Sequence, residues 1–223
     1  MHQLPLELGH RAAQGREDYL VSESNRDAVA WIDLWPDWPA PGLVIFGPPA
    51  SGKTHLAEVW RARSGAVRIE PNALAAADAT AWAGQVRYAV VEDADHGVDE
   101  TALLHLYNVL AERRGSLLLT AADAPARWAM RLPDLRSRIA ALPAVAIRAP
   151  DDELMQAVLV KLFADRQLRV EPELVTYLVT RLDRSFAAAK AAVAALDRAA
   201  LAERRAPTIP LARDALRHAG LLV

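Results

Sequence analysis

The sequence predicts an α/β fold: a parallel five-stranded sheet flanked by helices, followed by a small all-helical domain. Three observations predict it. Short apolar runs alternate with longer amphipathic segments between residues 42 and 148, a phosphate-loop pattern follows the first apolar run, and the strand pattern ceases after Pro150. Such alternation is typical of a parallel sheet whose strands are buried on both faces.

The expected elements follow one another in a regular order. Five apolar runs are interpreted as buried strands, over residues 43–46, 66–69, 88–91, 117–119 and 144–147. Helix-like stretches cover residues 26–35, 53–63, 74–83, 99–113 and 125–141, the first of them stopped by prolines. Beyond Pro150, helices are expected over 151–166, from Pro172, over 185–205 and from Pro210.

The composition excludes several kinds of site. The 223 residues contain no cysteine, so disulfides, zinc–thiolate sites and a cysteine nucleophile are excluded. The formal net charge of −2 is too balanced for a protein that holds nucleic acid by charge alone, and no direct sequence-specific DNA binding is expected. We find no signal-peptide pattern and no apolar run long enough to span a bilayer, so we expect a cytoplasmic protein with no membrane partner.

A phosphate loop is the most specific feature of the sequence. The pattern G-x-x-x-x-G-K-[ST] is matched, between a predicted strand and a predicted helix, by Gly47, Pro48, Pro49, Ala50, Ser51, Gly52, Lys53 and Thr54. The glycines let backbone N–H groups approach phosphate oxygens, and the helix start adds its positive end. In this pattern the lysine contacts the β- and γ-phosphates and the hydroxyl binds Mg²⁺, so ATP or ADP with Mg²⁺ is the expected ligand.

Two carboxylates end the third predicted strand. Glu92 and Asp93 follow the apolar run 88–91, and a carboxylate at this position of a phosphate-loop protein holds Mg²⁺ or orients the attacking water. Asp95 and His96 come next and are interpreted as loop residues rather than metal ligands.

Polar residues also follow the fourth predicted strand. Thr120 and Asp123 are candidates for sensing the γ-phosphate, although a plain strand end accounts for them equally well.

Arg136 and Arg138 precede the last strand. Taken alone, these arginines are more often solvated helix residues than an arginine finger, which stabilises charge on a transferring phosphoryl group.

Together these segments resemble the DnaA-related branch of the AAA+ ATPases, and within it the Hda-type regulators of DnaA. The resemblance rests on the lead-in from Asp18 to Ala28, on His55-Leu56 after the phosphate loop and on His105–Asn108. It also rests on the box Leu132-Pro133-Asp134-Leu135…Ser137-Arg138 and on the lid segments 181–184 and 208–210. The resemblance implies that Arg138 is an arginine finger acting in trans, and that nucleotide is also contacted by Tyr19, Leu20, Val21, Asn25, His55 and Arg184.

The resemblance further assigns the first residues to partner binding. Gln3, Leu4, Leu6 and Leu8 fit a Q-L-x-L-x-L peptide that docks on the sliding clamp, the β subunit of DNA polymerase III. Such a peptide binds as an extended anchor whose leucines fill an apolar groove. The implied organisation is residues 1–17 as the clamp-binding tip, 18–149 as the AAA+ core and 150–223 as the helical lid.

The sequence departs from the family pattern at three positions. Glu92 stands where Asp usually binds Mg²⁺, and Asp93 falls at the water-orienting position. The first sensor falls on Ala122, and the second-sensor arginine expected near Ala187 is missing, with Arg184 or Lys190 as possible substitutes.

We therefore expect a nucleotide-bound, replisome-associated bacterial protein with weak ATPase activity of its own, for which self-association into a homo-oligomer stays open. It would dock on the clamp and stimulate ATP hydrolysis by DnaA, and so act as a negative regulator of replication initiation. The main alternative is an autonomous AAA+ ATPase acting as a helicase-loader-like or clamp-loader-like motor. A nucleotide kinase is a weaker alternative, because the alanine-rich helices after Pro150 do not resemble an arginine-rich lid.

Overall fold

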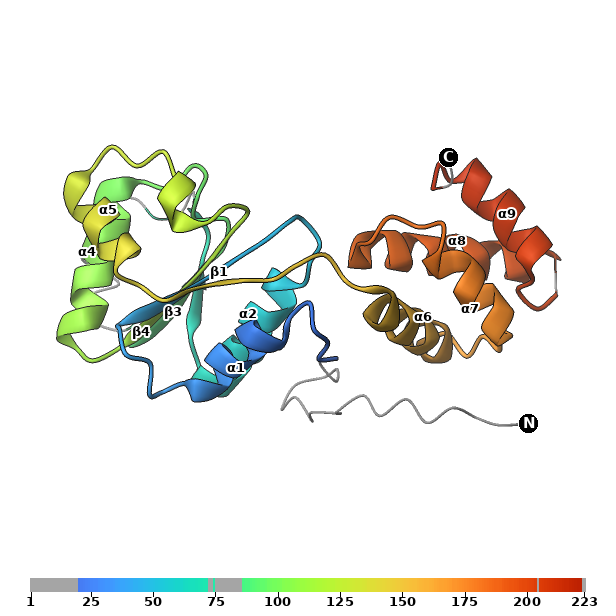
Figure 1. Cartoon of the computed structure of the whole chain (residues 1–223), viewed down its shortest axis with the longest axis horizontal. Coiled ribbons are helices and arrows are strands. Elements are labelled where there is room, and N and C mark those ends of the chain that lie inside the picture. The colour runs from blue at the N-terminus through green and yellow to red at the C-terminus, as the bar shows by residue number, and fades with distance from the viewer. Residues whose placement is uncertain (1–19, 72–73, 75–85, 204, 222–223) are drawn as a thin grey trace. The chain divides into compact units, whose positions relative to one another are not determined.

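The computed structural model describes residues 20–71, 74, 86–203 and 205–221 (Figure 1). These residues form two compact units. Residues 25–148 belong to an α/β unit, and residues 20–24 group with the helical unit that begins at residue 149. The predicted tip over residues 1–17, Tyr19 and nearly all of the predicted helix over 74–83 lie outside the described residues.

The α/β unit is built on one parallel sheet of five strands, as predicted. The strands are β1 (Gly42–Phe46), β2 (Val67–Ile69), β3 (Tyr88–Val91), β4 (Ser116–Ala121) and β5 (Ala144–Ala146). They are ordered β2-β3-β4-β1-β5, so β1 lies next to the last strand and to β4 rather than to its neighbour in sequence.

The strand register brings the polar strand ends to one edge of the sheet. Phe46 pairs with Ala121 and Val91 pairs with Leu119, so β1, β3 and β4 finish at nearly the same level. The segments that follow these three strands are therefore neighbours, although they are far apart in sequence.

Helices cover both faces of the sheet, α1 (Arg26–Leu34) and α2 (Lys53–Ser64) on one side and α4 (Glu100–Glu112) and α5 (Pro133–Ala140) on the other (Figure 1). Alternate strand residues point to opposite faces. Val44, Leu117 and Leu119 belong to the core cluster that also contains buried leucines of α4 and α5. On the α1–α2 side, Trp60 is fully buried and stacks on Trp38, with ring centroids 5.4 Å apart.

Two predicted elements differ from the structure. The stretch predicted as one helix over 125–141 is divided into a 3₁₀ turn (Pro125–Arg127) and α5. Pro133 stands at the start of α5, and the residue before a proline is disfavoured in helical conformation, so Leu132 is extended (φ −82°, ψ 110°). The strand predicted as buried over 66–69 forms the sheet edge as β2, where Val67 and Arg68 are exposed.

The helical unit has its own core. Its helices are α6 (Asp152–Asp165), α7 (Pro172–Val179), α8 (Phe186–Glu203) and α9 (Ile209–His218). The Asp151 carboxylate accepts a hydrogen bond from the Leu154 N–H (2.8 Å) and so caps α6. Buried alanines of α8, including Ala189 and Ala192, share this core with Phe163 and Leu216. Within the described ranges, no helix has the length and apolar character needed to cross a bilayer.

Candidate functional site

The loop between β1 and α2 depends on close backbone approach. A Cβ atom on Gly47 would lie 2.1 Å from the Ile147 carbonyl oxygen, so no larger residue fits without moving the backbone. Ala50 (φ 56°) and Gly52 (φ 104°) both adopt the left-handed conformation, and Gly52 leads directly into α2. The loop therefore wraps tightly and places the start of α2 at the sheet edge, as a phosphate loop requires.

Lys53 lies in the first turn of α2, and its ammonium group is held inside the loop. The Lys53 Nζ donates hydrogen bonds to the carbonyl oxygens of Gly47 (2.7 Å) and Pro48 (3.0 Å). Burial lowers the pKa of Lys53, and the nearby carboxylates of Asp93, Asp95 and Glu92 oppose that shift. The site thus places a cation where phosphate oxygens would bind.

Side chains from two elements, α2 and β2, contact Glu92, the residue that directly follows β3. The Thr54 hydroxyl donates a hydrogen bond to Glu92 Oε2 (2.5 Å), which joins α2 to the end of β3. From β2, Arg68 Nη1 lies 3.1 Å from Glu92 Oε1. That contact is an ion pair without a directed hydrogen bond, so Oε1 keeps acceptor capacity although Glu92 is only 6% exposed.

The donor atoms at this point suit Mg²⁺ chemically, because a hydroxyl and a carboxylate oxygen are hard ligands. No group of three or more histidine or acidic side chains that could hold a metal occurs among the described residues. An ion here would therefore need phosphate oxygens and water to complete its coordination. A buried Ser51 Oγ in the same loop has no hydrogen-bond partner among the described groups, which also fits a loop arranged for a polar ligand.

Asp93 and Asp95 connect the ends of β3 and β4. The Asp93 N–H donates to Thr120 Oγ1 (3.2 Å), so the buried Thr120 hydroxyl, a candidate sensor, supports the backbone of Asp93. Asp93 itself is exposed and has a left-handed backbone (φ 50°). Asp95 Oδ2 accepts from the N–H groups of Ala122 (2.9 Å) and Asp123 (3.2 Å).

Three further residues follow β3 and β4: the candidate sensor Asp123, the loop residue His96, and Ala122 at the first-sensor position. Asp123 is exposed, and its carboxylate pairs with Arg127 at 3.3 Å, a contact within its own loop. His96 is exposed, and its Nδ1 lies 3.1 Å from Asp95 Oδ1. Ala122 contacts Asp95 through its backbone N–H group.

The proposed arginine finger lies on the exposed side of α5. Arg138 is exposed, and its guanidinium lies 5.5 Å from the ring centroid of Tyr107 on α4, a cation–π contact. Arg136 is also exposed on α5. The start of this helix is fixed by Glu100, whose carboxylate accepts from the N–H groups of Arg131 (3.0 Å) and Leu132 (2.6 Å).

The predicted lead-in contacts are only partly described. Leu20 and Val21 are half-buried, and Asn25 is buried directly before α1, where its carbonyl accepts from the Val29 N–H (3.0 Å). His55 is exposed on α2. The nucleotide contacts predicted for these residues stay predictions.

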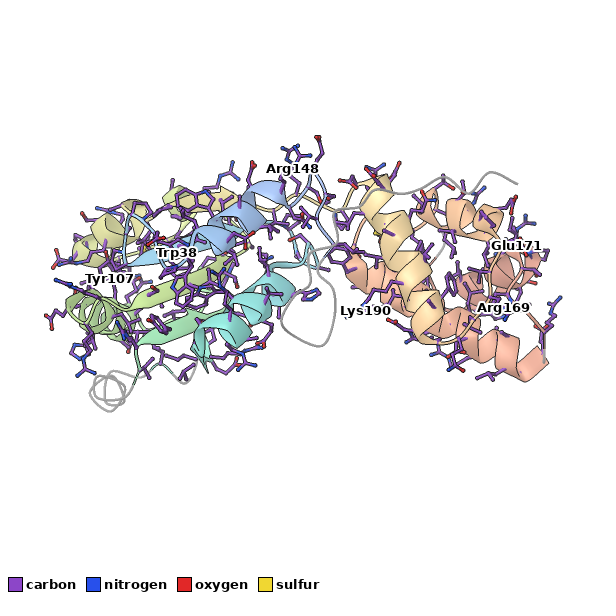
Figure 2. The ribbon with its side chains drawn as sticks, turned by 90° about the horizontal axis from the view of Figure 1, so that it is seen from below. Trp38, Tyr107, Arg148, Arg169, Glu171 and Lys190 are labelled. Carbon is purple, nitrogen blue, oxygen red and sulfur yellow. The ribbon has the colours of Figure 1, made fainter. Side chains whose placement is uncertain are left out.

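The candidates for the second sensor lie in the helical unit. Arg184 Nη2 pairs with Asp152 Oδ1 at 2.8 Å, and both side chains are more than half exposed. Lys190 is an exposed residue of α8, labelled in Figure 2 together with Arg169 and Glu171 of the same unit. Whether either cation takes the sensor's place stays a prediction.

Three residues at or beside the site were missed by sequence reasoning: Arg68, Asp95 as a backbone acceptor, and Glu100. Each acts on a partner at least 24 residues away. The sequence carried only a weak signal for them. An arginine inside a short apolar run, and acidic residues shortly after an acidic strand end, are both common without such contacts.

Part of the chain matches a known family model. Residues 151–216 match the model described as the Hda lid domain. An uncharacterized protein of Haemophilus influenzae is 31% identical over 118 residues, which cover 52% of this chain and 51% of that protein. The chain therefore spans about half the length of this curated relative.

Solved structures share the fold over most of the chain. Domain III of the Thermotoga maritima replication initiation protein DnaA is 16% identical, with a TM-score of 0.78 over 90% of this chain and 94% of that one. AMPPCP-bound DnaA from Aquifex aeolicus is 16% identical, with a TM-score of 0.71 over 91% and 66% of the two chains. The Thermotoga maritima RuvB branch migration motor is 10% identical, with a TM-score of 0.72 over 87% and 68%. At these identities the likeness shows the fold, a phosphate-loop core with a helical lid.

Proposed function

We propose that this chain, a DnaA-related AAA+ protein with an Hda-type lid, is a regulator that stimulates ATP hydrolysis by DnaA. The observation that carries the proposal is Arg138. It lies in the Leu132–Arg138 box, is exposed on α5, and is held by a cation–π contact to Tyr107. An exposed arginine that is already oriented suits insertion into the nucleotide site of a partner.

In this mechanism the chain supplies charge rather than a nucleophile. The Arg138 guanidinium would approach the transferring phosphoryl group of ATP on DnaA and stabilise its developing negative charge. Contact with the Tyr107 ring limits the motion of the guanidinium, so less conformational entropy is lost when the two proteins meet.

The chain's own phosphate loop would bind ADP or ATP. Support comes from the loop geometry around Gly47, from the buried Lys53 ammonium and from the fold shared with a DnaA solved with AMPPCP. Thr54 and Glu92 would hold Mg²⁺, whose charge offsets that of the phosphates when it is bound. Asp93, exposed beside them, would orient water.

The N-terminal tip would carry the chain to DNA. The sequence Gln3-Leu4-Pro5-Leu6-Glu7-Leu8 fits an extended anchor for the sliding clamp. A clamp loaded on DNA would then raise the local concentration of this chain near DnaA without direct DNA contacts. The proposed outcome is fewer ATP-bound initiators and hence repression of replication initiation.

The test uses two neighbouring arginines of α5. Arg138→Ala is expected to abolish stimulation of DnaA ATP hydrolysis, measured as phosphate release with DnaA, the DNA-loaded clamp and this chain present. Arg136→Ala is the matched control, since Arg136 is exposed on the same helix and is not the residue that the resemblance assigns to the finger. ADP affinity should stay within about twofold of wild type in both variants. Unchanged stimulation by Arg138→Ala would contradict the proposal.

The competing function is an autonomous ATPase motor. It requires that the purified chain turn over ATP by itself, at about 1 per second or faster. The proposal expects much slower turnover, because the second-sensor arginine expected near Ala187 is missing and Ala122 stands at the first sensor. A steady-state ATPase measurement on the chain alone separates the two functions.

A further inference from the structure

We propose that Arg68 opposes metal binding at Glu92, so that this chain binds nucleotide with little dependence on Mg²⁺. The inference rests on the proposed nucleotide site and concerns its metal requirement. Where β2 pairs with β3, the positive charge of Arg68 lies against Glu92, the carboxylate that would hold the metal.

The contact is short and lies at a buried carboxylate. Arg68 Nη1 is 3.1 Å from Glu92 Oε1, and the Glu92 side chain is 8% exposed. The other oxygen, Oε2, already accepts the Thr54 hydroxyl at 2.5 Å. Oε2 thus accepts a hydrogen bond, while Oε1 accepts none and faces the positive charge of Arg68.

Arg68 is held in this position from several sides. Its backbone is in β2, paired in register with Val90 of β3, two residues before Glu92. Its Nε donates to Glu70 Oε1 at 3.0 Å, and its Nη1 lies 3.8 Å from Glu58 Oε1 on α2.

A divalent cation at Glu92 would therefore meet a competing charge. Charges a few ångströms apart repel each other, and the burial of Glu92 limits screening on its side, whereas solvent partly screens the 41% exposed Arg68 side chain. Either Arg68 must release Glu92, which costs the ion pair, or the metal must bind beside a cation. Both alternatives lower Mg²⁺ affinity relative to a site without Arg68.

This arrangement suits a protein that keeps its nucleotide instead of hydrolysing it. A metal ion is needed chiefly to neutralise charge during phosphoryl transfer, whereas ADP can be retained by backbone N–H groups and Lys53. Arg68 would thus bias the site towards stable occupancy by ADP. The expected signature is a nucleotide affinity that is nearly equal with and without Mg²⁺.

The experiment compares the dissociation constant of ADP in excess Mg²⁺ and in excess EDTA by calorimetry. For the wild type the two constants should agree within about threefold, and for Arg68→Gln Mg²⁺ should tighten binding by about tenfold or more. Arg68→Lys retains the charge and should remain closer to wild type. Mn²⁺ bound in the presence of ADP, followed by electron paramagnetic resonance, should rise in Arg68→Gln.

Arg61→Gln is the matched control. Arg61 also pairs with Glu58 (2.8 Å), which lies on its own helix, and its side chain is 43% exposed against 41% for Arg68. Arg61→Gln should show the wild-type ratio between the ADP dissociation constants in EDTA and in Mg²⁺. A strong Mg²⁺ dependence in the wild type, or a ratio in Arg68→Gln equal to that of the wild type, overturns the role of Arg68. Absence of ADP binding in the wild type under both conditions instead contradicts the proposed nucleotide site and the inference built on it.

Discussion

At the residue scale, Gly47 and Lys53 show which contacts hold the phosphate loop in place. The close approach of Gly47 to the Ile147 carbonyl lets the loop pack on the chain that follows β5. Next to it, the Ile147 N–H donates to the Phe46 carbonyl at 2.7 Å. Lys53 Nζ donates hydrogen bonds to two carbonyl oxygens of the loop. The loop is thus organised largely by its own backbone.

Gly47→Ala tests this packing. The added methyl group would lie 2.1 Å from a backbone oxygen, so the loop and the segment after β5 must separate. We expect a loss of about 2 kcal/mol or more of unfolding free energy, measured by urea denaturation, and much weaker ADP binding.

Gly65→Ala is the control for this substitution. Gly65 has a left-handed backbone (φ 71°) at the end of α2, and a Cβ there meets no atom within 4 Å. Its cost should be limited to about 1 kcal/mol of backbone strain, with ADP affinity preserved. Equal losses of stability and of ADP affinity in the two variants would show that the contact of Gly47 with Ile147 is not important for the loop.

At the element scale, the segment before α5, the helix that carries the proposed finger Arg138, is attached to the start of α4. Glu100 begins α4 and accepts the N–H groups of Arg131 and Leu132 directly before α5. Carboxylates near a helix start also interact favourably with the helix dipole. The Glu100 side chain thus fixes where α5 begins and thereby helps to position Arg138 on that helix.

Glu100→Gln should loosen this attachment. A neutral amide is a weaker acceptor for two backbone N–H groups, so hydrogen exchange at Arg131 and Leu132 should accelerate by about tenfold or more. If Arg138 is the finger, stimulation of DnaA should fall several-fold while ADP affinity is unchanged. Glu112→Gln, at the exposed far end of α4, should change neither quantity. Unaltered exchange in Glu100→Gln would contradict the positioning role.

Much of the element pattern followed from the sequence, for local physical reasons. Strand–helix alternation predicted the parallel sheet, and the phosphate-loop pattern predicted the turn from β1 into α2. The break before α5 was missed because the apolar pattern continued past Pro133. Arg68 and Glu100 could not be assigned roles, because their partners are set by strand order and by loop packing, which a single sequence does not fix.

At the scale of the whole molecule, two units carry separate hydrophobic cores, one on the sheet and one among α6–α9. The proposed functions fall on different parts of the sequence. Nucleotide binding belongs to the loop at residues 47–54, the finger to Arg138, and clamp docking to residues 3–8, which lie outside the described residues. If this assignment is right, each function can be removed while the others persist.

Replacing Gln3, Leu4, Leu6 and Leu8 by alanine tests this separation. The variant should lose retention on an immobilised sliding clamp, because the apolar anchor and its glutamine are gone, while ADP affinity and thermal melting stay at wild-type values. Stimulation of DnaA by the variant should fall in assays with the clamp loaded on DNA. Raising the variant's concentration should restore part of the stimulation, because the clamp only raises the local concentration of the chain, whereas Arg138 stabilises the transferring phosphoryl group. Retention on the clamp by the variant would contradict the anchor. Loss of ADP binding together with clamp binding would contradict the separation of the two functions.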